Sequence, residues 1–302
     1  MVTGYEPRED AKFEMETRKY LDRVRHLIPL GIRQRIIQPL VYGTAAFLVD
    51  TGSRVLGQHD PDVPPARLRL LGSLNYKAGG YEFLHYFTTL GGLASDHHVL
   101  DIGCGIGSKA FAMARYLRSG RYDGIDVVPG SIEWCKRNIS RRFPNFNFQV
   151  ADIYNPVYNP LGKQRASDYR FPFADESFDF VVLTSVFTHL LGADAQNYLG
   201  EIGRLLRPGG RVVSTWFLLD QSVRSRMSKN SESRQFVHPS DREGVWIEDW
   251  EFPEASVGYD SSLVRTMYDR AGLEIQEPVH VGSWSAPEES LSYQDLIVAI
   301  RR

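Results

Sequence analysis

Nine residues, Val99 to Gly107, constrain the fold of this chain more than any other stretch: they read Val-Leu-Asp-Ile-Gly-Cys-Gly-Ile-Gly. The apolar run predicts a buried β-strand, and glycines at 103, 105 and 107 predict a sharp turn into a helix. Because glycine has no Cβ, the backbone N–H groups of such a turn can approach a ligand closely. The carboxylate of Asp101 beside the turn would repel a pyrophosphate, so a cationic ligand fits better.

Further strands with the same organisation are predicted downstream, each followed by a polar residue. They cover residues 121–126, 147–152 and 178–184. The last residues of these stretches are Asp126, Asp152 and Thr184, respectively. In an open parallel sheet, ligands bind outside the carboxyl ends of the strands, so the three side chains should converge on the glycine turn. An acid at the end of the second strand suits the two hydroxyls of a ribose.

Together these stretches resemble the class I S-adenosylmethionine-dependent methyltransferases over residues 76–302, about three quarters of the chain. The matching parts are the glycine motif 99–107, the ribose acid Asp126, the adenine motif 151–153, the fourth-strand region 171–190 and the turn 206–210. The resemblance implies an α/β fold: a Rossmann-like, seven-stranded, mostly parallel sheet with an antiparallel last strand and helices on both faces. Residues 294–300 fit that last strand, and residues 272–283 should pair with them as a hairpin.

By the same resemblance the cofactor is S-adenosyl-L-methionine, the product is S-adenosyl-L-homocysteine, and no metal is required. The residues expected to bind the cofactor are Asp101, Gly103, Cys104, Gly105, Gly107, Asp126, Val127, Asp152, Ile153 and Thr184. Tyr76 and Gly80 join them because, in this family, the segment before the first strand often closes over the methionine end of the cofactor.

The implied chemistry is displacement at a sulfonium methyl group, which requires the acceptor, the methyl carbon and the sulfur to be held in line. A hydroxyl acceptor must also lose a proton, so it needs a nearby base. His189, just beyond the fourth strand, is the first candidate, although it could instead cap a helix or bond a loop; His238 is the weaker candidate. We therefore expect O-methylation of a small-molecule acceptor that is sugar-containing, lipid-linked or a natural product.

The core of the enzyme is predicted to occupy residues 65–302, after an N-terminal helical extension at residues 1–64. Two inserts, 153–178 and 220–259, interrupt this core, and loops of such length are either functional or disordered. Their aromatic and proline content favours order. The first should border the adenine pocket or the acceptor site, and the second should form a lid with aromatic walls.

The N-terminal extension contains a basic, amphipathic stretch. Residues 9–28 predict one helix and a second begins near Ile32, with basic residues dominating from Arg18 to Arg35. Residues 39–49 are mostly apolar but shorter than the roughly 20 residues of a membrane span. Packing over the core or against a second copy of the chain, as in a homodimer, is the commoner outcome. Peripheral contact with an anionic membrane is the alternative, with a lipid headgroup or a quinone as acceptor.

Composition and missing motifs argue against other classes of partner and cofactor. At 302 residues with a net charge of −2, the chain has no global basic field for nucleic acid. It also lacks the Asp/Asn-Pro-Pro-Tyr/Phe motif of enzymes that methylate nucleic-acid bases. Two cysteines and no visible signal peptide favour a cytoplasmic location. Ser108 replaces the third glycine of a nicotinamide-dehydrogenase motif counted from Gly103. A non-catalytic cofactor-binding or scaffold protein stays open.

Overall fold

The computed structural model describes residues 46–52, 55–57, 60–69, 75–156, 158–229, 234–240, 242–285, 287 and 289–302. The helices predicted at residues 9–28 and from Ile32 onward, with their basic residues, therefore lie outside the described residues. So does most of the proposed N-terminal extension, 1–64.

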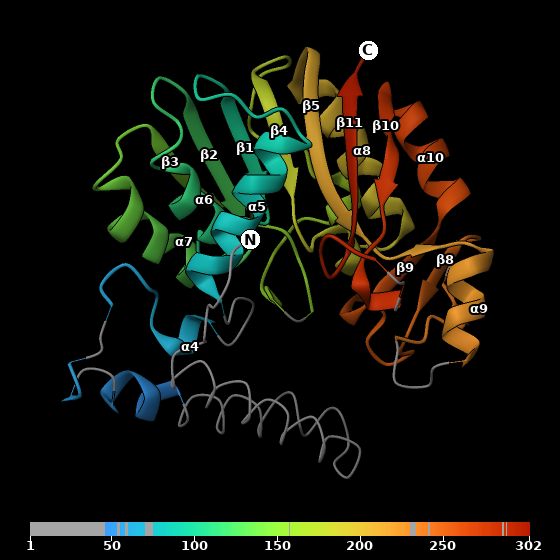
Figure 1. Ribbon diagram of the computed structural model, residues 1–302, viewed down its shortest axis with the longest axis horizontal. Helices are drawn as coiled ribbons and strands as arrows, with labels where there is room; N and C mark the ends of the chain where they lie inside the picture. Colours follow the sequence, from blue (N-terminus) through green and yellow to red (C-terminus); the bar gives the residue numbers. More distant parts are fainter. Residues whose placement is uncertain are drawn as a thin grey trace.

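A seven-stranded sheet forms the centre of the molecule (Figure 1). Its strands are β1 His98–Ile102, β2 Arg121–Asp126, β3 Phe146–Val150, β4 Phe178–Leu183, β5 Leu206–Trp216, β10 Leu273–His280 and β11 Asp295–Arg301. They lie in the order β10-β11-β5-β4-β1-β2-β3. Strands β1 to β5 run parallel, and β11 runs antiparallel to both of its neighbours. The predicted Rossmann-like sheet, its antiparallel last strand and the C-terminal hairpin are confirmed.

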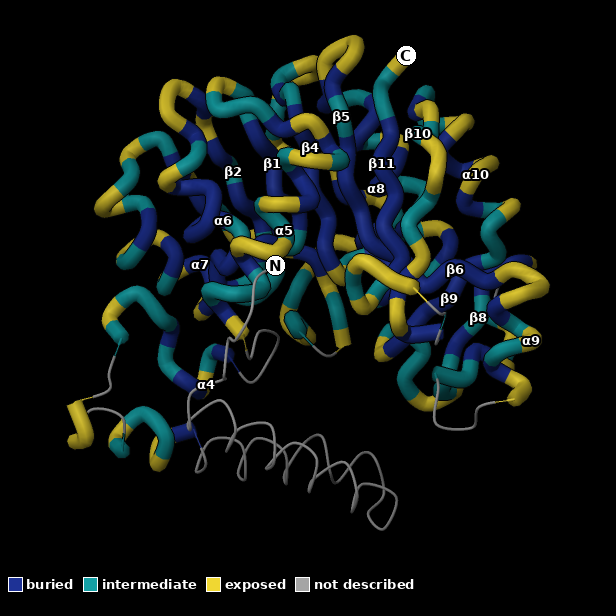
Figure 2. The backbone as a smooth tube through the Cα atoms, viewed as in Figure 1, coloured by how far each residue is buried: buried dark blue, intermediate teal, exposed yellow. Residues whose placement is uncertain are grey.

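Helices cover both faces of this sheet (Figure 1). They are α5 Tyr76–Thr89, α6 Ser108–Met113, α7 Pro129–Cys135, α8 Gly192–Leu205 and α10 Ser261–Arg270, whereas α4 Ala66–Arg69 and α9 Gln221–Lys229 lie away from these faces. Successive residues of a strand face opposite sides. Val99 of β1 accordingly packs in the cluster containing α5, α6 and α7, whereas Leu100 packs in the cluster containing α8 and α10. Burial on both faces explains why β4, in the middle of the sheet, is apolar and buried from Phe180 to Leu183 (Figure 2).

A second, four-stranded sheet lies beside the main one and was not predicted. It consists of β6 Leu218–Leu219, β7 His238–Pro239, β8 Val245–Ile247 and β9 Val257–Asp260, in the order β6-β9-β8-β7. Most of it comes from the insert 220–259. Phe217, Phe236 and Trp284 are almost fully buried in its hydrophobic cluster. Phe236 of the insert therefore packs against Phe217 and Trp284, which lie before and after the insert in the sequence.

Asp295, at the start of β11, connects the two sheets. It is 2% exposed and accepts hydrogen bonds from the backbone N–H groups of Leu218 and Gly282, both at 2.7 Å. The indole N–H of Trp284 donates a third at 2.8 Å. Burial raises the pKa of Asp295 from 3.8 to about 6, although the three donors oppose the shift.

This pKa makes the contribution of Asp295 to stability depend on pH. Because the folded state holds the proton more tightly, the contribution is fully present below pH 3.8 and is lost as the pH rises through about 6. We expect the free energy of unfolding of the wild type, relative to Asp295→Asn, to fall by up to about 3 kcal/mol from pH 4 to pH 7. Urea unfolding of both proteins across this range measures the difference. Parallel stability profiles would contradict the assignment.

Candidate active site

A cavity of about 1140 Å³ opens at the carboxyl ends of β1 to β4. Small-molecule sites typically measure about 300–1,000 Å³, so there is room for a cofactor and an acceptor together. The sequence-predicted residues in its wall are Gly103, Cys104, Gly105, Asp126, Val127, Ile153, Thr184 and His189. Both inserts and residues 292–294, just before β11, complete the wall.

The glycine turn after β1 has the backbone that the sequence predicts. Gly103, Gly105 and Gly107 have φ of 76°, 54° and 77°, in the left-handed region. A Cβ at Gly103 would lie 2.4 Å from a side-chain methyl of Val186, so packing requires glycine there. A Cβ at Gly105 would meet no atom within 4 Å. Gly105 lines the cavity, so its open space is available to a ligand.

Asp126, the last residue of β2, presents its carboxylate to the same cavity. Its Oδ2 accepts a hydrogen bond from Gly105 N–H at 2.7 Å, and its Oδ1 accepts one from Val128 N–H at 2.9 Å. Burial raises its pKa, while these backbone donors favour the charged form. Each carboxylate oxygen retains acceptor capacity, so the pair can accept from two adjacent hydroxyls of a ribose. These residues fit the cofactor that the sequence predicts.

Asp101 lies behind the glycine turn and outside the cavity wall. It is fully buried, and its Oδ2 accepts a hydrogen bond from the Tyr122 hydroxyl at 2.6 Å. Its Oδ1 has no hydrogen-bond partner among the described residues. Burial raises its pKa, with Lys109 and Tyr122 opposing the shift. Its contact with a cofactor therefore remains a prediction.

Four further predicted residues also lie outside the wall. The hydroxyl of Tyr76 donates to the Gly107 carbonyl at 3.1 Å, so both residues belong to the packing of α5 against α6. A Cβ at Gly80 would lie 2.3 Å from the Ser108 carbonyl oxygen, so this glycine permits that close approach. Asp152 is exposed, beyond the end of β3. Their contacts with a cofactor remain predictions.

His189 lies in the wall on a short turn, η5 Phe187–His189, after β4. Its Nδ1 is 3.0 Å from the carbonyl oxygen of Glu254, in the second insert. A carbonyl can only accept, so Nδ1 carries the proton and Nε2 of the neutral ring has a lone pair. Burial lowers the pKa of His189 from 6.5, which favours the neutral ring. Such a side chain can act as a base.

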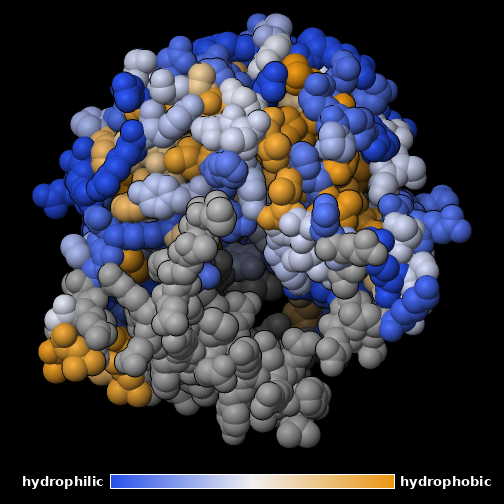
Figure 3. Space-filling model, in the orientation of Figure 1, coloured by the Kyte–Doolittle hydropathy of each residue, from blue (hydrophilic) through white to orange (hydrophobic). Residues whose placement is uncertain are grey.

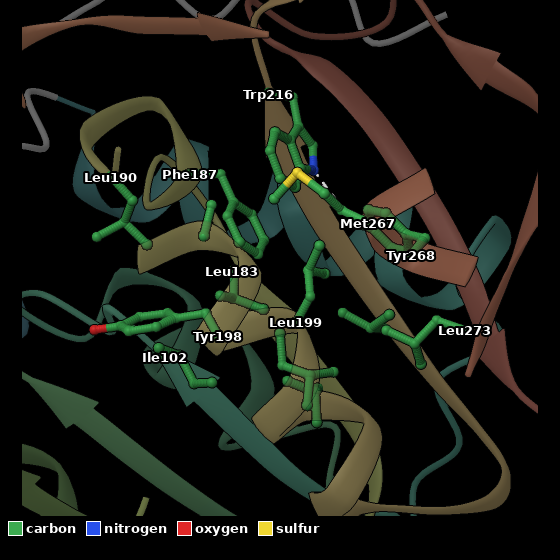
Figure 4. Packing of buried hydrophobic residues seen from close by; sticks show 14 of the residues in the cluster. Ile102, Leu183, Phe187, Leu190, Tyr198, Leu199, Trp216, Met267, Tyr268 and Leu273 are labelled. Atoms are coloured by element: carbon green, nitrogen blue, oxygen red, sulfur yellow. Dashed lines mark hydrogen bonds between the residues drawn. The ribbon is translucent and has the colours of Figure 1, made fainter. Parts of the chain in front are cut away.

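Aromatic packing fixes the turn that carries His189. Phe187 stacks on Trp216 of β5 with ring centroids 3.9 Å apart (Figure 4). Both side chains are fully buried, and Leu190 packs in the same cluster. The hydroxyl of Tyr259 donates to the Leu190 carbonyl at 2.5 Å, which ties the turn to β9. The candidate base is thus held by the main sheet and by the insert.

The weaker candidate base, His238, is not in the cavity wall. It lies on β7, with its ring centroid 5.4 Å from that of the exposed Trp250. None of the insert's aromatic side chains lines the cavity, and Phe236 instead packs against Phe217 and Trp284. The insert contributes polar groups to the wall, from Arg234 and from residues 254–256.

Several cavity residues had no signal in the sequence. They include Tyr158, Ser185, Arg234, Glu254, Tyr293 and Gln294. Arg234 donates to Glu248 at 2.6 Å and to Ser256 at 2.8 Å, and its guanidinium lies 4.9 Å from the ring centre of Phe217. These cavity residues belong to no sequence motif, and only the folding of distant segments brings them together.

Comparison with known proteins gives the same domain type. The sequence profile of a methyltransferase domain matches residues 100–214. The chain is 34% identical over 112 residues to the phthiotriol/phenolphthiotriol dimycocerosates methyltransferase of Mycobacterium tuberculosis, covering 37% of this chain and 34% of that one. It is 30% identical over 122 residues to the O-methyltransferase cnsE of Penicillium expansum, covering 40% and 38%. The matches thus span well under half of each relative.

A solved structure shares the fold. The S-adenosylmethionine dependent methyltransferase from Mesorhizobium loti superposes with a TM-score of 0.50 at 15% identity, covering 74% of this chain and 99% of that one.

Proposed function

The chain carries a class I S-adenosylmethionine-dependent methyltransferase domain, and on this premise we propose that the protein methylates an oxygen of a small-molecule acceptor. The cofactor of the domain is S-adenosylmethionine. When bound, it supplies a methyl group already activated by a positively charged sulfur. The acceptor is sugar-containing, lipid-linked or a natural product, as the sequence predicts.

One observation carries this proposal: a single cavity brings together the Gly105–Asp126 cradle and His189. Asp126 would accept from the ribose hydroxyls, and the open side of Gly105 leaves room for the cofactor. The hydrogen bond from Nδ1 to Glu254 leaves the Nε2 lone pair of His189 for an acceptor proton. An oxygen acceptor needs this proton transfer, whereas an amine or a thiolate needs less help.

The atom that receives the methyl group can be identified directly. The protein is incubated with S-adenosylmethionine carrying a ¹³C-labelled methyl and a small-molecule extract of cells that produce the chain. Carbon NMR of the products should show the label in an O-methyl environment. Label found only in N-, S- or C-methyl groups would contradict the oxygen assignment, and no transfer above a boiled control would contradict activity on any molecule in that extract.

A second candidate function, methylation of a lipid headgroup or quinone at a membrane surface, is favoured by an exposed apolar patch. Phe47, Leu48, Val55 and Leu56 are 60–80% exposed. The patch lies on the segment before α4 and is coloured as hydrophobic in Figure 3. Large exposed patches often mark protein or membrane contacts. No helix among the described residues is both long enough and apolar enough to cross a bilayer.

Vesicle binding tests this second candidate. We expect the full chain to co-sediment with anionic vesicles, and a Phe47→Ser, Leu48→Ser double variant to co-sediment severalfold less, because insertion of these side chains buries apolar area. Variant Leu161→Ser, which removes an exposed apolar side chain outside the cavity wall, serves as the control. Equal partitioning of the wild type and the double variant would remove the membrane candidate and leave the methyltransferase proposal intact.

A further inference from the structure

Ser185, the residue next to Thr184 at the end of β4, has an unusual backbone. Its φ is 59°, and among the described residues only Glu176 shares a left-handed φ without being glycine. A side chain with a Cβ is disfavoured there, so the surroundings must impose this conformation. Backbone strain of this kind gathers at functional sites. Ser185 is an exposed residue in the cavity wall.

A closed ring of hydrogen bonds holds Ser185 in place. Its N–H donates to the Thr215 hydroxyl oxygen at 2.7 Å, and that hydroxyl donates to Oε1 of Gln294 at 2.6 Å. Nε2 of Gln294 then donates back to the Ser185 hydroxyl oxygen at 2.9 Å. The three residues come from the end of β4, from β5 and from the segment before β11.

The orientation of the Gln294 amide sets the direction of the bonds in this ring. The Thr215 hydroxyl accepts from the backbone N–H of Ser185 and donates its own proton to the amide oxygen Oε1 of Gln294. The amide oxygen of Gln294 therefore faces Thr215, and its NH₂ faces Ser185. Since the Ser185 oxygen accepts, its own proton is not used by the ring.

Among the described residues, that proton has no partner at a good hydrogen-bond distance. The Thr188 hydroxyl oxygen lies 3.5 Å from the Ser185 hydroxyl oxygen, whereas O–H···O hydrogen bonds are about 2.7–2.8 Å. The Ser185 hydroxyl is thus a preoriented donor on the cavity wall. His189 follows four residues later and lines the same cavity.

We propose that Ser185 donates a hydrogen bond to a second oxygen of the acceptor, adjacent to the oxygen whose proton His189 takes. The acceptor then carries two neighbouring oxygens, as in a vicinal diol, and Thr215 and Gln294 act as positioning residues for Ser185. This inference rests on the proposed function, because it assumes that the acceptor lies beside His189.

Matched pairs of simple alcohols test the inference without knowledge of the natural acceptor. The full chain, saturated with S-adenosylhomocysteine, is titrated with catechol and phenol, and with cis-1,2-cyclohexanediol and cyclohexanol, by ligand-observed NMR. One neutral hydrogen bond predicts that the diol binds about fivefold more tightly in at least one pair. Ser185→Ala should bring the two affinities to within about twofold.

Two further variants test whether the preference for the diol depends on Ser185 or on any hydroxyl in the cavity wall. Gln294→Leu breaks the ring and should also remove the preference, whereas Ser167→Ala removes another serine hydroxyl from the wall and should retain it. Equal affinities of the wild type in both pairs, or a preference that survives Ser185→Ala, would overturn the inference. Failure of S-adenosylhomocysteine to bind would instead overturn the proposed function itself, so the two failures are distinguishable.

Discussion

Replacing His189 with alanine should lower kcat by about 100- to 10,000-fold, the usual contribution of a general base. The affinity for S-adenosylhomocysteine should stay within a few fold, because the cradle for the cofactor is formed by Gly105 and Asp126. Steady-state kinetics with labelled cofactor and calorimetric titration measure the two quantities separately.

The variant His189→Asn distinguishes a catalytic base from a histidine that only holds the turn. The side-chain amide of His189→Asn can still donate to the Glu254 carbonyl, as Nδ1 does, but it has no lone pair equivalent to Nε2. A base role therefore predicts that the asparagine variant is as inactive as the alanine variant. Recovery of activity in His189→Asn, or unchanged kcat in both variants, would show that the ring serves only to hold the turn.

The pH dependence of kcat is a third test of the role of His189. Burial lowers its pKa below the ordinary 6.5, so the neutral, basic form persists to lower pH. Activity should fall on the acid side only below pH 6.5. That acid limb should be absent from the residual activity of His189→Ala. The same limb in both proteins would assign it to another group.

Replacing Asp126 with alanine should weaken the binding of S-adenosylhomocysteine by at least about 100-fold, because two hydrogen bonds to a charged carboxylate are lost. The loop also loses the anchor that Asp126 provides for Gly105 N–H. Calorimetric titration measures the change.

The matched control for this variant is Asp123→Ala on the same strand. Its carboxylate interacts with His98 at 2.6 Å, away from the cavity, so cofactor affinity should be retained. Circular dichroism confirms that both variants are folded. Unchanged affinity in Asp126→Ala would contradict the proposed site.

The main sheet could be predicted because its strands are locally recognisable. Buried parallel strands are apolar on both faces, and the glycines of 103–107 identify the turn from the residue type alone. The positions of Asp126 and Thr184 at strand ends then follow from the parallel arrangement. The burial of Asp101 behind the turn could not be predicted, because a residue's position beside a loop does not reveal which way its side chain points.

The small sheet could not be predicted, because its strands are two to four residues long and pair across long stretches of sequence. Periodicity cannot be detected in so few residues. The ring of Ser185, Thr215 and Gln294 was missed for a related reason. Its members come from three separate strand ends, and the left-handed φ of a serine has no sequence signal.

The most direct test of the whole account is a calorimetric titration of the full chain with S-adenosylhomocysteine and, separately, with NAD. We expect saturable, micromolar, one-to-one binding of S-adenosylhomocysteine and no detectable binding of NAD. Micromolar binding of NAD with none of S-adenosylhomocysteine would contradict it.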